Sequence, residues 1–269
     1  MTAPGFRCAL SGLRLLLDHP DAAKADFSSV RAVIYAGSGI AAHTLKRALN
    51  QIKCDFIQFY GATETACGIT FLRPADHDVQ NETRLKSCGS PLPLIEIKVA
   101  DAEGNEVPVG TVGEFLIRSP SLTTGYFRQP EVTAAAFKDG WYRSGDGGYR
   151  DAEGYLYIVD RVKDMIISGG ENVYSTEVEQ AIQKLKGVQM CAAVGLPDPK
   201  WGERVVAVIV KDPAVELSSD QVIGHCRSLI AGYKVPKQVE FVQALPMTPS
   251  GKVMKRALRD TLLKETATA

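Results

Sequence analysis

The spacing of apolar residues divides the chain into three stretches with different periodicities. In residues 1–75, short apolar runs alternate with segments of helical periodicity. This pattern predicts helices at 9–18 and 41–52 and strands at 30–36 and 55–60. Alternating strands and helices favour layered α/β structure with parallel strands, so we expect a partial α/β subdomain here.

The period shortens toward two in residues 76–162. Strands are predicted at 95–99, 113–118 and 155–159. The tetrapeptide Asp-Ala-Glu-Gly occurs at 101–104 and again at 151–154, and nothing around the two copies matches. Because Asp and Gly supply turn chemistry, both copies are interpreted as hairpin turns rather than as a repeat. We expect this stretch to form a small β-barrel-like subdomain.

Alternation of strands and helices returns in residues 163–269. The expected elements are strands near 165–167, at 188–194, 205–210 and 239–242, and helices at 175–185, at 219–229 and from 254 onward. They predict a compact α+β domain of about 100 residues, a common domain size. Its boundary is expected near Asp160 to Asp164, where charge interrupts two apolar strands.

Composition narrows the class of protein. The 269 residues hold 31 Lys and Arg against 31 Asp and Glu, with 45% apolar residues, so a disordered chain is excluded. Balanced charge gives no general attraction to nucleic acid or anionic lipid. No apolar run approaches the roughly 20 residues of a membrane helix, and the first residues do not form a signal peptide. Six cysteines without a CxxC pair indicate reduced thiols, so a cytoplasmic protein is expected.

A glycine-rich segment follows the first predicted strand. Gly37-Ser38-Gly39-Ile40-Ala41-Ala42 satisfies the dinucleotide pattern, with Asp55 at the distance expected of a ribose-binding acid. In a dinucleotide fold that acid ends the second strand, whereas Asp55 begins it, so NAD binding is disfavoured. Glycines at a strand end still permit close approach of a flat or phosphorylated ligand.

Two further segments combine aromatic, glycine and acidic residues. Phe59 to Thr65 places an aromatic ring, a glycine, hydroxyls and a carboxylate in one connection, which fits either a nucleotide pocket or the N-cap of a helix. Trp141 to Asp146 ends in a carboxylate that fits either a ribose diol or a glycine–aspartate turn. The residues alone leave both pairs of interpretations open.

Two turns near the C-terminus carry candidate chemistry. Gly169-Gly170 follows a predicted strand and fits either a tight turn or a backbone that lies against a ligand. Thr248-Pro249-Ser250-Gly251-Lys252 lacks the spacing and the final hydroxyl of a P-loop, so Lys252 is not a Walker lysine. An isolated lysine on a surface turn is usually a solvated charge.

Taken in order, these segments resemble a known superfamily. The residues that carry the resemblance are Tyr60-Gly-Ala-Thr-Glu64, Gly113-Glu114 with Gly125-Tyr126, Tyr142-Arg-Ser-Gly-Asp146, Asp160-Arg161 to Glu177-Val-Glu179, and Pro249-Ser-Gly-Lys252. They closely resemble the adenylate-forming superfamily, which includes acyl-CoA synthetases, carrier-protein-loading adenylation domains and firefly luciferase. The resemblance extends from about residue 20 to the end, and it implies a large α/β domain with a β-barrel subdomain, followed by a mobile α+β lid domain.

The resemblance also implies a role for each motif residue. The residues expected to contact ATP or AMP are Ala36, Gly37, Ser38, Tyr60, Gly61, Ala62, Thr63, Asp146, Arg161 and Lys252. Within this set, Tyr60 lies beside the base and Thr63 contacts the α-phosphate. Glu64, outside the set, holds Mg²⁺, and the resemblance implies that Thr63, Glu64 and Lys252 are catalytic. Asp146 binds the ribose, supported by Arg161, and Lys252 is the adenylation lysine, whose fixed charge stabilises the developing negative charge.

A second group of residues is implied for the thiol-transfer step. Lys163 falls at the hinge position, and rotation there exchanges Lys252 for the loop of Ser168, Gly169 and Gly170. Trp201 matches a position that packs on CoA in some ligases, although a half-buried structural tryptophan is the alternative. The implied cofactors are ATP, Mg²⁺ and CoA, with a carboxylic acid as substrate. CoA is favoured over a carrier protein as the acceptor.

The resemblance is incomplete at the front. Superfamily members carry a Ser/Thr/Gly-rich phosphate loop ending in Pro-Lys-Gly, and no such stretch occurs in this sequence. The chain is therefore interpreted as the C-terminal half of a synthetase, with low activity alone and open strand edges that favour self-association or a separate N-terminal half. A non-catalytic module that binds AMP and CoA is the alternative function. The sequence does not identify the acid.

Overall fold

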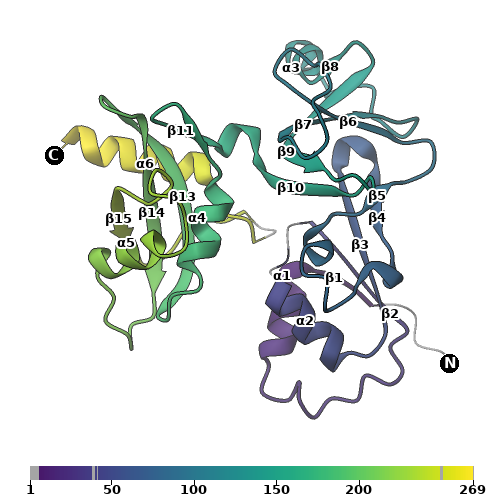
Figure 1. Cartoon of the computed structure of the whole chain (residues 1–269), viewed down its shortest axis with the longest axis horizontal. Coiled ribbons are helices and arrows are strands. Elements are labelled where there is room, and N and C mark those ends of the chain that lie inside the picture. The colour runs from purple at the N-terminus through teal and green to yellow at the C-terminus, as the bar shows by residue number, and fades with distance from the viewer. Residues whose placement is uncertain (1–5, 38–39, 41, 249–250, 269) are drawn as a thin grey trace. The chain divides into compact units, whose positions relative to one another are not determined.

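The computed structural model describes residues 6–37, 40, 42–248 and 251–268 (Figure 1). The chain folds as two compact units that divide between Ile158 and Val159. Ser38, a predicted nucleotide contact, lies outside the described residues.

The first unit begins with a five-stranded sheet whose strand order follows the chain. Its strands are β1 (Phe6–Ala9), β2 (Ala32–Ala36), β3 (Asp55–Ala62), β4 (Cys67–Leu72) and β5 (Ser90–Pro91). Strands β1, β2 and β3 are parallel, which confirms the expected layering, whereas β4 and β5 are antiparallel additions. Helices α1 (Leu10–Asp18) and α2 (Ala42–Gln51) bury Leu13, Leu17 and Leu45 against Tyr35 and Phe56.

A second sheet completes the first unit. It contains β6 (Glu96–Ala100), β7 (Gly113–Arg118), β8 (Phe137–Lys138), β9 (Trp141–Arg150) and β10 (Leu156–Arg161), with the short helix α3 (Pro130–Ala136) before β8. The order β10-β9-β7-β6 is an open path in the described residues. The expected barrel is therefore a half-barrel, because β10 and β6 do not pair with each other to close it.

The two Asp-Ala-Glu-Gly copies are turns, as expected. In each copy the glycine N–H donates to the aspartate carbonyl, and both distances are 3.1 Å. Gly104 and Gly154 have φ of +94° and +86°, values that a side chain disfavours. The same four residues thus form the same turn twice, without any repeat around them.

The second unit packs helices on both faces of an antiparallel sheet to which one parallel strand is added. Its strands are β11 (Ile166–Ser168), β12 (Glu171–Val173), β13 (Val188–Asp198), β14 (Gly202–Lys211) and β15 (Gln238–Phe241). Helices α4 (Ser175–Ile182) and α5 (Ser219–Arg227) cover one face, and α6 (Lys255–Thr268) covers the other. Because both faces are covered, the run Val205 to Val210 is buried throughout, which explains its unbroken apolar sequence.

Several elements of the first unit were not expected from the sequence, namely helix α3 and strands β1, β4, β5, β8 and β9. Strand β4 was overlooked because Thr63 to Thr65 was interpreted as the possible start of a helix. The long strand β9 was overlooked because three glycines interrupt its period, and α3 because it is only seven residues long.

The division between the units lies four residues earlier than the expected start of the C-terminal domain at 163. The Asp160 carboxylate accepts hydrogen bonds from the Ser175 N–H (2.5 Å) and hydroxyl (2.6 Å) at the start of α4. The Thr176 hydroxyl donates to the Val159 carbonyl. These bonds attach residues 159 and 160 to the second unit.

Candidate functional site

The carboxyl ends of two parallel strands lie side by side in the first unit. Ala36, the last residue of β2, pairs with Phe59 in β3, so Gly37 and Tyr60 follow at the same edge of the sheet. Gly37 has φ of +98°, and a Cβ built on it meets no atom within 4 Å. Carboxyl ends of parallel strands are where ligands bind in α/β sheets. This edge of the sheet therefore offers the exposed backbone of Gly37 beside the Tyr60 ring, an arrangement that suits binding of a nucleotide base.

The segment after Tyr60 is a tight turn between two strands. Thr63 to Thr65 form one 3₁₀ turn, and strand β4 follows directly. The Thr65 hydroxyl donates to the Ala62 carbonyl at 2.8 Å and accepts from the Ala62 N–H at 2.9 Å, which closes the turn. The alternative interpretation, a helix N-cap at Thr63 or Thr65, is wrong because no helix follows. Thr63 is instead left exposed.

Asp146 lies within a bulge in the middle of β9. The pairing of β7 with β9 shifts by two residues between Glu114 and Leu116, and Gly145 takes φ of +69° in the extra segment. The Gly145 N–H donates to Glu114 Oε1 at 3.0 Å. Bulges re-aim side chains and are frequent next to active sites. The alternative of a glycine–aspartate chain reversal is wrong, since the glycine serves a bulge inside a strand.

The bulge brings Asp146 to Tyr60. The Tyr60 hydroxyl donates to Asp146 Oδ2 at 2.7 Å, and Asp146 is 9% exposed. Burial, reinforced by the nearby Asp146 carboxylate, raises the pKa of Tyr60 well above its usual range, so the phenol stays protonated as a donor. A buried, oriented carboxylate beside the edge of the sheet suits a ribose diol.

Glu64 is held by a second phenol. The Tyr126 hydroxyl donates to Glu64 Oε1 at 2.7 Å, and burial followed by the Glu64 carboxylate raises the pKa of Tyr126. In the described residues, no three His, Cys, Asp or Glu side chains gather into a metal site. A single carboxylate nevertheless fits Mg²⁺ that arrives with a nucleotide, because Mg²⁺ uses one or two carboxylates together with phosphate oxygens and water. A carboxylate that accepts from Tyr126 retains lone pairs for such a role.

Lys252 pairs with Thr248 in the second unit. Its N–H donates to the Thr248 hydroxyl at 3.0 Å, and its carbonyl accepts from the Thr248 N–H at 2.8 Å. Gly251 has φ of +80°, while Pro249 and Ser250 are outside the described residues. The Lys252 side chain is exposed. A short loop that presents a lysine at its base suits delivery of a positive charge to an external substrate.

Lys255, three residues further on, anchors this loop. Its Nζ lies 2.7 Å from Glu179 Oε1 and also donates to the Ser175 hydroxyl. Glu179 Oε1 also accepts from the Ala193 N–H at 2.9 Å. Both side chains of the ion pair are mostly buried. The ion pair therefore joins the first turn of α6 to α4.

The glycine pair forms the tip of a hairpin. Gly169 and Gly170 connect β11 to β12 with φ of +64° and +83°, the two positive values of a type I′ turn. The Gly169 N–H donates to the Trp201 carbonyl at 2.8 Å, and a Cβ on Gly169 would stand 3.0 Å from the indole ring. Ser168, the third predicted residue of this loop, is buried in β11. Gly169, Gly170 and the 38% exposed Trp201 therefore share one surface, to which the buried Ser168 side chain does not contribute.

Lys163, the expected hinge, lies in a single 3₁₀ turn from Val162 to Asp164. Asp160 and Arg161 immediately precede this turn, and the Arg161 N–H donates to Asp160 Oδ1 at 2.8 Å. Because Asp160 is bonded to α4, residues on both sides of Lys163 belong to the second unit. The predicted site residues are thus divided, with those up to Asp146 in the first unit and those from Arg161 onward in the second.

Sequence reasoning gave no role to Tyr126, Tyr142, Glu179 or Lys255. Burial raises the pKa of the Tyr142 phenol, and the nearby Glu64 and Tyr126 side chains add to this effect. Tyr142 therefore interacts with the Glu64 carboxylate, as Tyr126 does. Tyr126, Tyr142 and Glu179 stand inside the motifs that carry the family resemblance, and this was the available signal. Lys255 had a weaker one, a lysine at the start of the last amphipathic helix.

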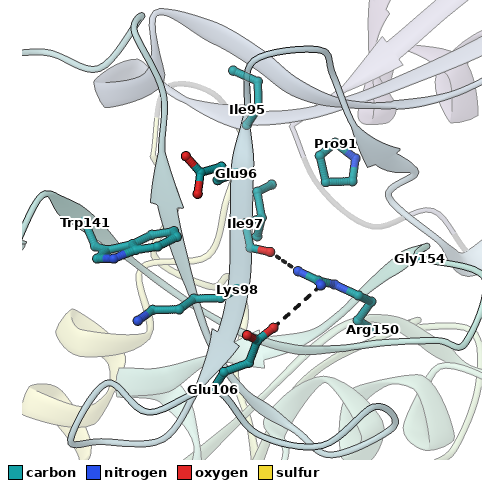
Figure 2. Close-up of a pocket in the computed structure, with 9 residues that line it drawn as sticks. All are labelled: Pro91, Ile95, Glu96, Ile97, Lys98, Glu106, Trp141, Arg150 and Gly154. Carbon is teal, nitrogen blue, oxygen red and sulfur yellow. Dashed lines mark hydrogen bonds and ion pairs between the residues drawn. The ribbon is translucent and has the colours of Figure 1, made fainter.

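A surface hollow of about 480 Å³ lies elsewhere on the first unit, around the edge strand β6. It is lined by Pro91, Ile95, Glu96, Ile97, Lys98, Glu106, Trp141, Arg150 and Gly154. Figure 2 shows Arg150 reaching the Ile97 carbonyl and Glu106. Lys98 donates to the Gly104 carbonyl at 2.9 Å. The hollow contains none of the predicted site residues. Its basic side chains, Lys98 and Arg150, both bind groups of the protein itself.

Four cysteines have side chains that the structure describes, and none of them is placed among the predicted site residues. Cys54, Cys88, Cys191 and Cys226 are free thiols, and burial raises the pKa of both Cys88 and Cys191 to about 12. These thiols stay protonated at neutral pH and are poor nucleophiles. Among the described residues, no helix combines the length and apolar character needed to cross a membrane.

Comparison with known proteins assigns the chain to a family. The family profile described as AMP-binding enzyme matches residues 6–127, and the profile of the AMP-binding enzyme C-terminal domain matches residues 177–252. The chain belongs to the AMP-binding enzyme family. This confirms the resemblance to adenylate-forming enzymes. The two matches include Tyr60 to Glu64 in the first unit and Trp201 and Lys252 in the second, whereas Asp146, Arg161 and the Gly169–Gly170 turn lie between them.

Curated relatives of the chain include several ligases. A feruloyl-CoA synthase of Amycolatopsis is 41% identical over 90% of this chain and 48% of its own length. The medium/long-chain-fatty-acid–CoA ligase FadD8 of Mycobacterium tuberculosis is 40% identical over 93% of this chain and 44% of its own. The chain thus spans about half the length of the curated relatives it matches.

Solved structures give the same result for the fold. The amide bond synthetase McbA from Marinactinospora thermotolerans aligns with a TM-score of 0.86 and 36% identity, over 97% of this chain and 52% of McbA. ATP-bound MatB from Rhodopseudomonas palustris aligns with a TM-score of 0.87 and 33% identity, over 96% of this chain and 51% of MatB. The AMP-binding enzyme therefore has the mixed α/β fold expected for about half of such a structure.

Proposed function

We propose that this chain is the adenylate- and CoA-binding half of an AMP-forming acid–CoA ligase. In the first half-reaction, a carboxylate oxygen attacks the α-phosphorus of ATP and the bond to the β-phosphate breaks, which releases pyrophosphate. In the second, the CoA sulfur attacks the acyl carbonyl and AMP leaves. The names of the relatives, most of them acid–CoA ligases, support this reaction class.

One observation carries the proposal. Tyr60, near the end of β3 and three residues before Thr63, donates its hydroxyl hydrogen bond to the buried Asp146 carboxylate. Within the first unit, a ribose-binding carboxylate, a base-facing edge and a phosphate-facing turn therefore share one strand end. This arrangement suits AMP, and a CoA-binding module alone would not require it.

Each residue has a defined task in the proposed site. Asp146 holds the ribose, Tyr60 orients Asp146, and the exposed Thr63 donates a hydrogen bond to the α-phosphate. Lys252 supplies positive charge as the α-phosphate becomes more negative. Mg²⁺, bound through Glu64 and the phosphates, would neutralise the leaving pyrophosphate.

The second half-reaction would use the hairpin tip. Backbone without side chains at Gly169 and Gly170 lets the pantetheine arm lie close, and the partly exposed Trp201 offers an apolar face. One relative, a fatty acid–acyl-carrier-protein ligase of Streptomyces coeruleorubidus, is 38% identical, so the acceptor must be tested rather than assumed.

The proposal is tested by calorimetric titration of the 269-residue chain with AMP. We expect weak binding that Asp146→Asn reduces about tenfold, since a hydrogen bond to a charged group contributes about 1.5–3 kcal/mol. Tyr149→Phe is the control, because Tyr149 stacks on Tyr157 in an apolar cluster that includes neither Tyr60 nor Asp146. Binding that is absent, or unaffected by Asp146→Asn, contradicts the adenylate site.

The chemical step needs a second assay. The chain alone, and the chain mixed with the separately expressed N-terminal half of a relative, are compared for pyrophosphate release with ferulate, a medium-chain fatty acid and o-succinylbenzoate. We expect little release by the chain alone and acid-dependent release by the mixture. CoA and an acyl carrier protein are then offered as competing acceptors. AMP binding without release from any mixture would favour the non-catalytic module.

A further inference from the structure

A loop that precedes α3 braces the turn carrying Thr63 and Glu64. The Ser121 hydroxyl donates to the Thr65 carbonyl at 2.9 Å, and the Thr123 N–H donates to the Glu64 carbonyl at 2.8 Å. The Tyr126 hydroxyl adds a third bond, to the Glu64 carboxylate itself, at 2.7 Å. Two of these bonds fix the backbone of the turn, and the third fixes the side chain.

Tyr126 is in turn held from its own side. Its N–H donates to the Thr133 hydroxyl at 2.9 Å, and its ring lies 6.4 Å from that of Phe137. The preceding Gly125 has φ of +148°, and a Cβ there would lie 2.6 Å from Thr133 Cγ2. A glycine is thus required where the loop meets α3. The phenol is directed at Glu64 by packing rather than by chance orientation.

We infer that Tyr126 is a positioning residue that sets the orientation of the Glu64 carboxylate for a nucleotide-bound divalent cation. The inference rests on the proposed function, because it takes Glu64 as the cation ligand. The Tyr126 hydroxyl engages Oε1 and limits rotation of the carboxylate, so less freedom is lost when the cation binds. Groups that orient a ligand in this way typically change metal affinity by about 10–100-fold.

The test uses Mn²⁺ as a paramagnetic probe for the cation. The 269-residue chain with saturating ATP is titrated with Mn²⁺ and followed by electron paramagnetic resonance. We expect Tyr126→Phe to weaken Mn²⁺ binding about tenfold and to leave metal-free AMP affinity unchanged. Tyr149→Phe, which removes a phenol that does not contact Glu64, is the matched control and should match the wild type.

Each outcome decides the inference. Equal Mn²⁺ affinity in Tyr126→Phe and wild type overturns it, as does a parallel loss of AMP affinity, which would show a merely structural role. If Tyr126→Phe does not fold, Thr133→Val removes the anchor of the Tyr126 N–H instead, and unchanged Mn²⁺ affinity there overturns the inference. If the wild-type chain binds AMP but not Mn²⁺, Glu64 is not a cation ligand and the inference is refuted, whereas the proposed AMP site is not. Wild type that binds neither refutes the proposed function.

Discussion

Tyr60 and Asp146 are 86 residues apart in the sequence, yet the phenol hydroxyl lies 2.7 Å from the carboxylate oxygen Oδ2. One residue comes from the end of β3 and the other from a bulge in β9. Their hydrogen bond links the two sheets of the first unit at the place where the AMP-binding enzyme is proposed to hold a ribose.

The first prediction concerns this bond. Tyr60→Phe keeps the ring and removes the donor, which leaves a nearly buried carboxylate short of one partner. We expect the free energy of unfolding of the first unit to fall by about 1–3 kcal/mol, the usual cost of an unsatisfied buried group. AMP affinity should fall as well, because Asp146 loses its fixed orientation. Urea unfolding and AMP titration check the two effects, and an unchanged affinity would mean that Tyr60 stabilises without orienting.

The second prediction concerns the buried ion pair of Lys255 with Glu179. Lys255→Met leaves the mostly buried Glu179 without its cation, and we expect a loss of about 3 kcal/mol in the stability of the second unit. Lys255→Arg keeps the positive charge, so this variant should retain most of the stability of the second unit. The chain has two tryptophans, Trp141 and Trp201, one in each unit. Fluorescence in a Trp141→Phe background therefore reports the second unit alone, and a loss below about 0.5 kcal/mol would contradict the anchoring role.

The third prediction concerns pH and His77. This side chain is 8% exposed, with Nδ1 2.8 Å from the Arg73 carbonyl and Nε2 2.9 Å from the Tyr35 hydroxyl. Nδ1 must donate to the carbonyl, so neutral Nε2 accepts from Tyr35. Burial lowers the pKa of His77 below 6.5, against smaller opposing effects of the Arg73 carbonyl and the Asp76 carboxylate.

Because the unfolded chain then binds a proton that the folded chain excludes, stability falls as pH drops below about 6.5, by up to about 1.4 kcal/mol per pH unit. This loss of stability stops once the pH falls below the pKa of His77 in the folded protein. Urea unfolding at pH 7.5 and 5.5, followed through Trp141 in a Trp201→Phe background, measures this slope. His77→Gln should flatten it, and an equal slope in both proteins would assign the pH dependence to other groups.

The fourth prediction concerns the edge strand β6. Arg150 donates to the Ile97 carbonyl and pairs with Glu106 at 3.6 Å, so part of the outer edge is already occupied (Figure 2). Arg150→Ala uncovers that carbonyl, and unpaired strand edges recruit other chains. We expect concentration-dependent association in sedimentation velocity. Glu106→Gln removes the ion pair but keeps the bond to Ile97, so it should stay like the wild type.

Much of the fold follows from local sequence. The apolar run Val205 to Val210 predicted a strand, and the structure shows why it is apolar throughout, because helices cover both faces of β14. Other elements depend on pairing with distant strands. Strand β9 carries Gly145, Gly147 and Gly148, residues that favour turns locally, and only pairing with β7 and β8 makes this segment a strand.

The sequence by itself determined the order of the motifs, the layered first unit and the glycine turns, because backbone conformation and apolar periodicity are local properties. It also determined the family, since the motif residues match one by one. Tertiary structure alone decided the partners: Tyr60 with Asp146, Glu64 with Tyr126, and Glu179 with Lys255. Each pair joins residues more than 60 positions apart. Strand register, a two-residue bulge and helix packing bring them together, and none of these is encoded in the spacing of either partner.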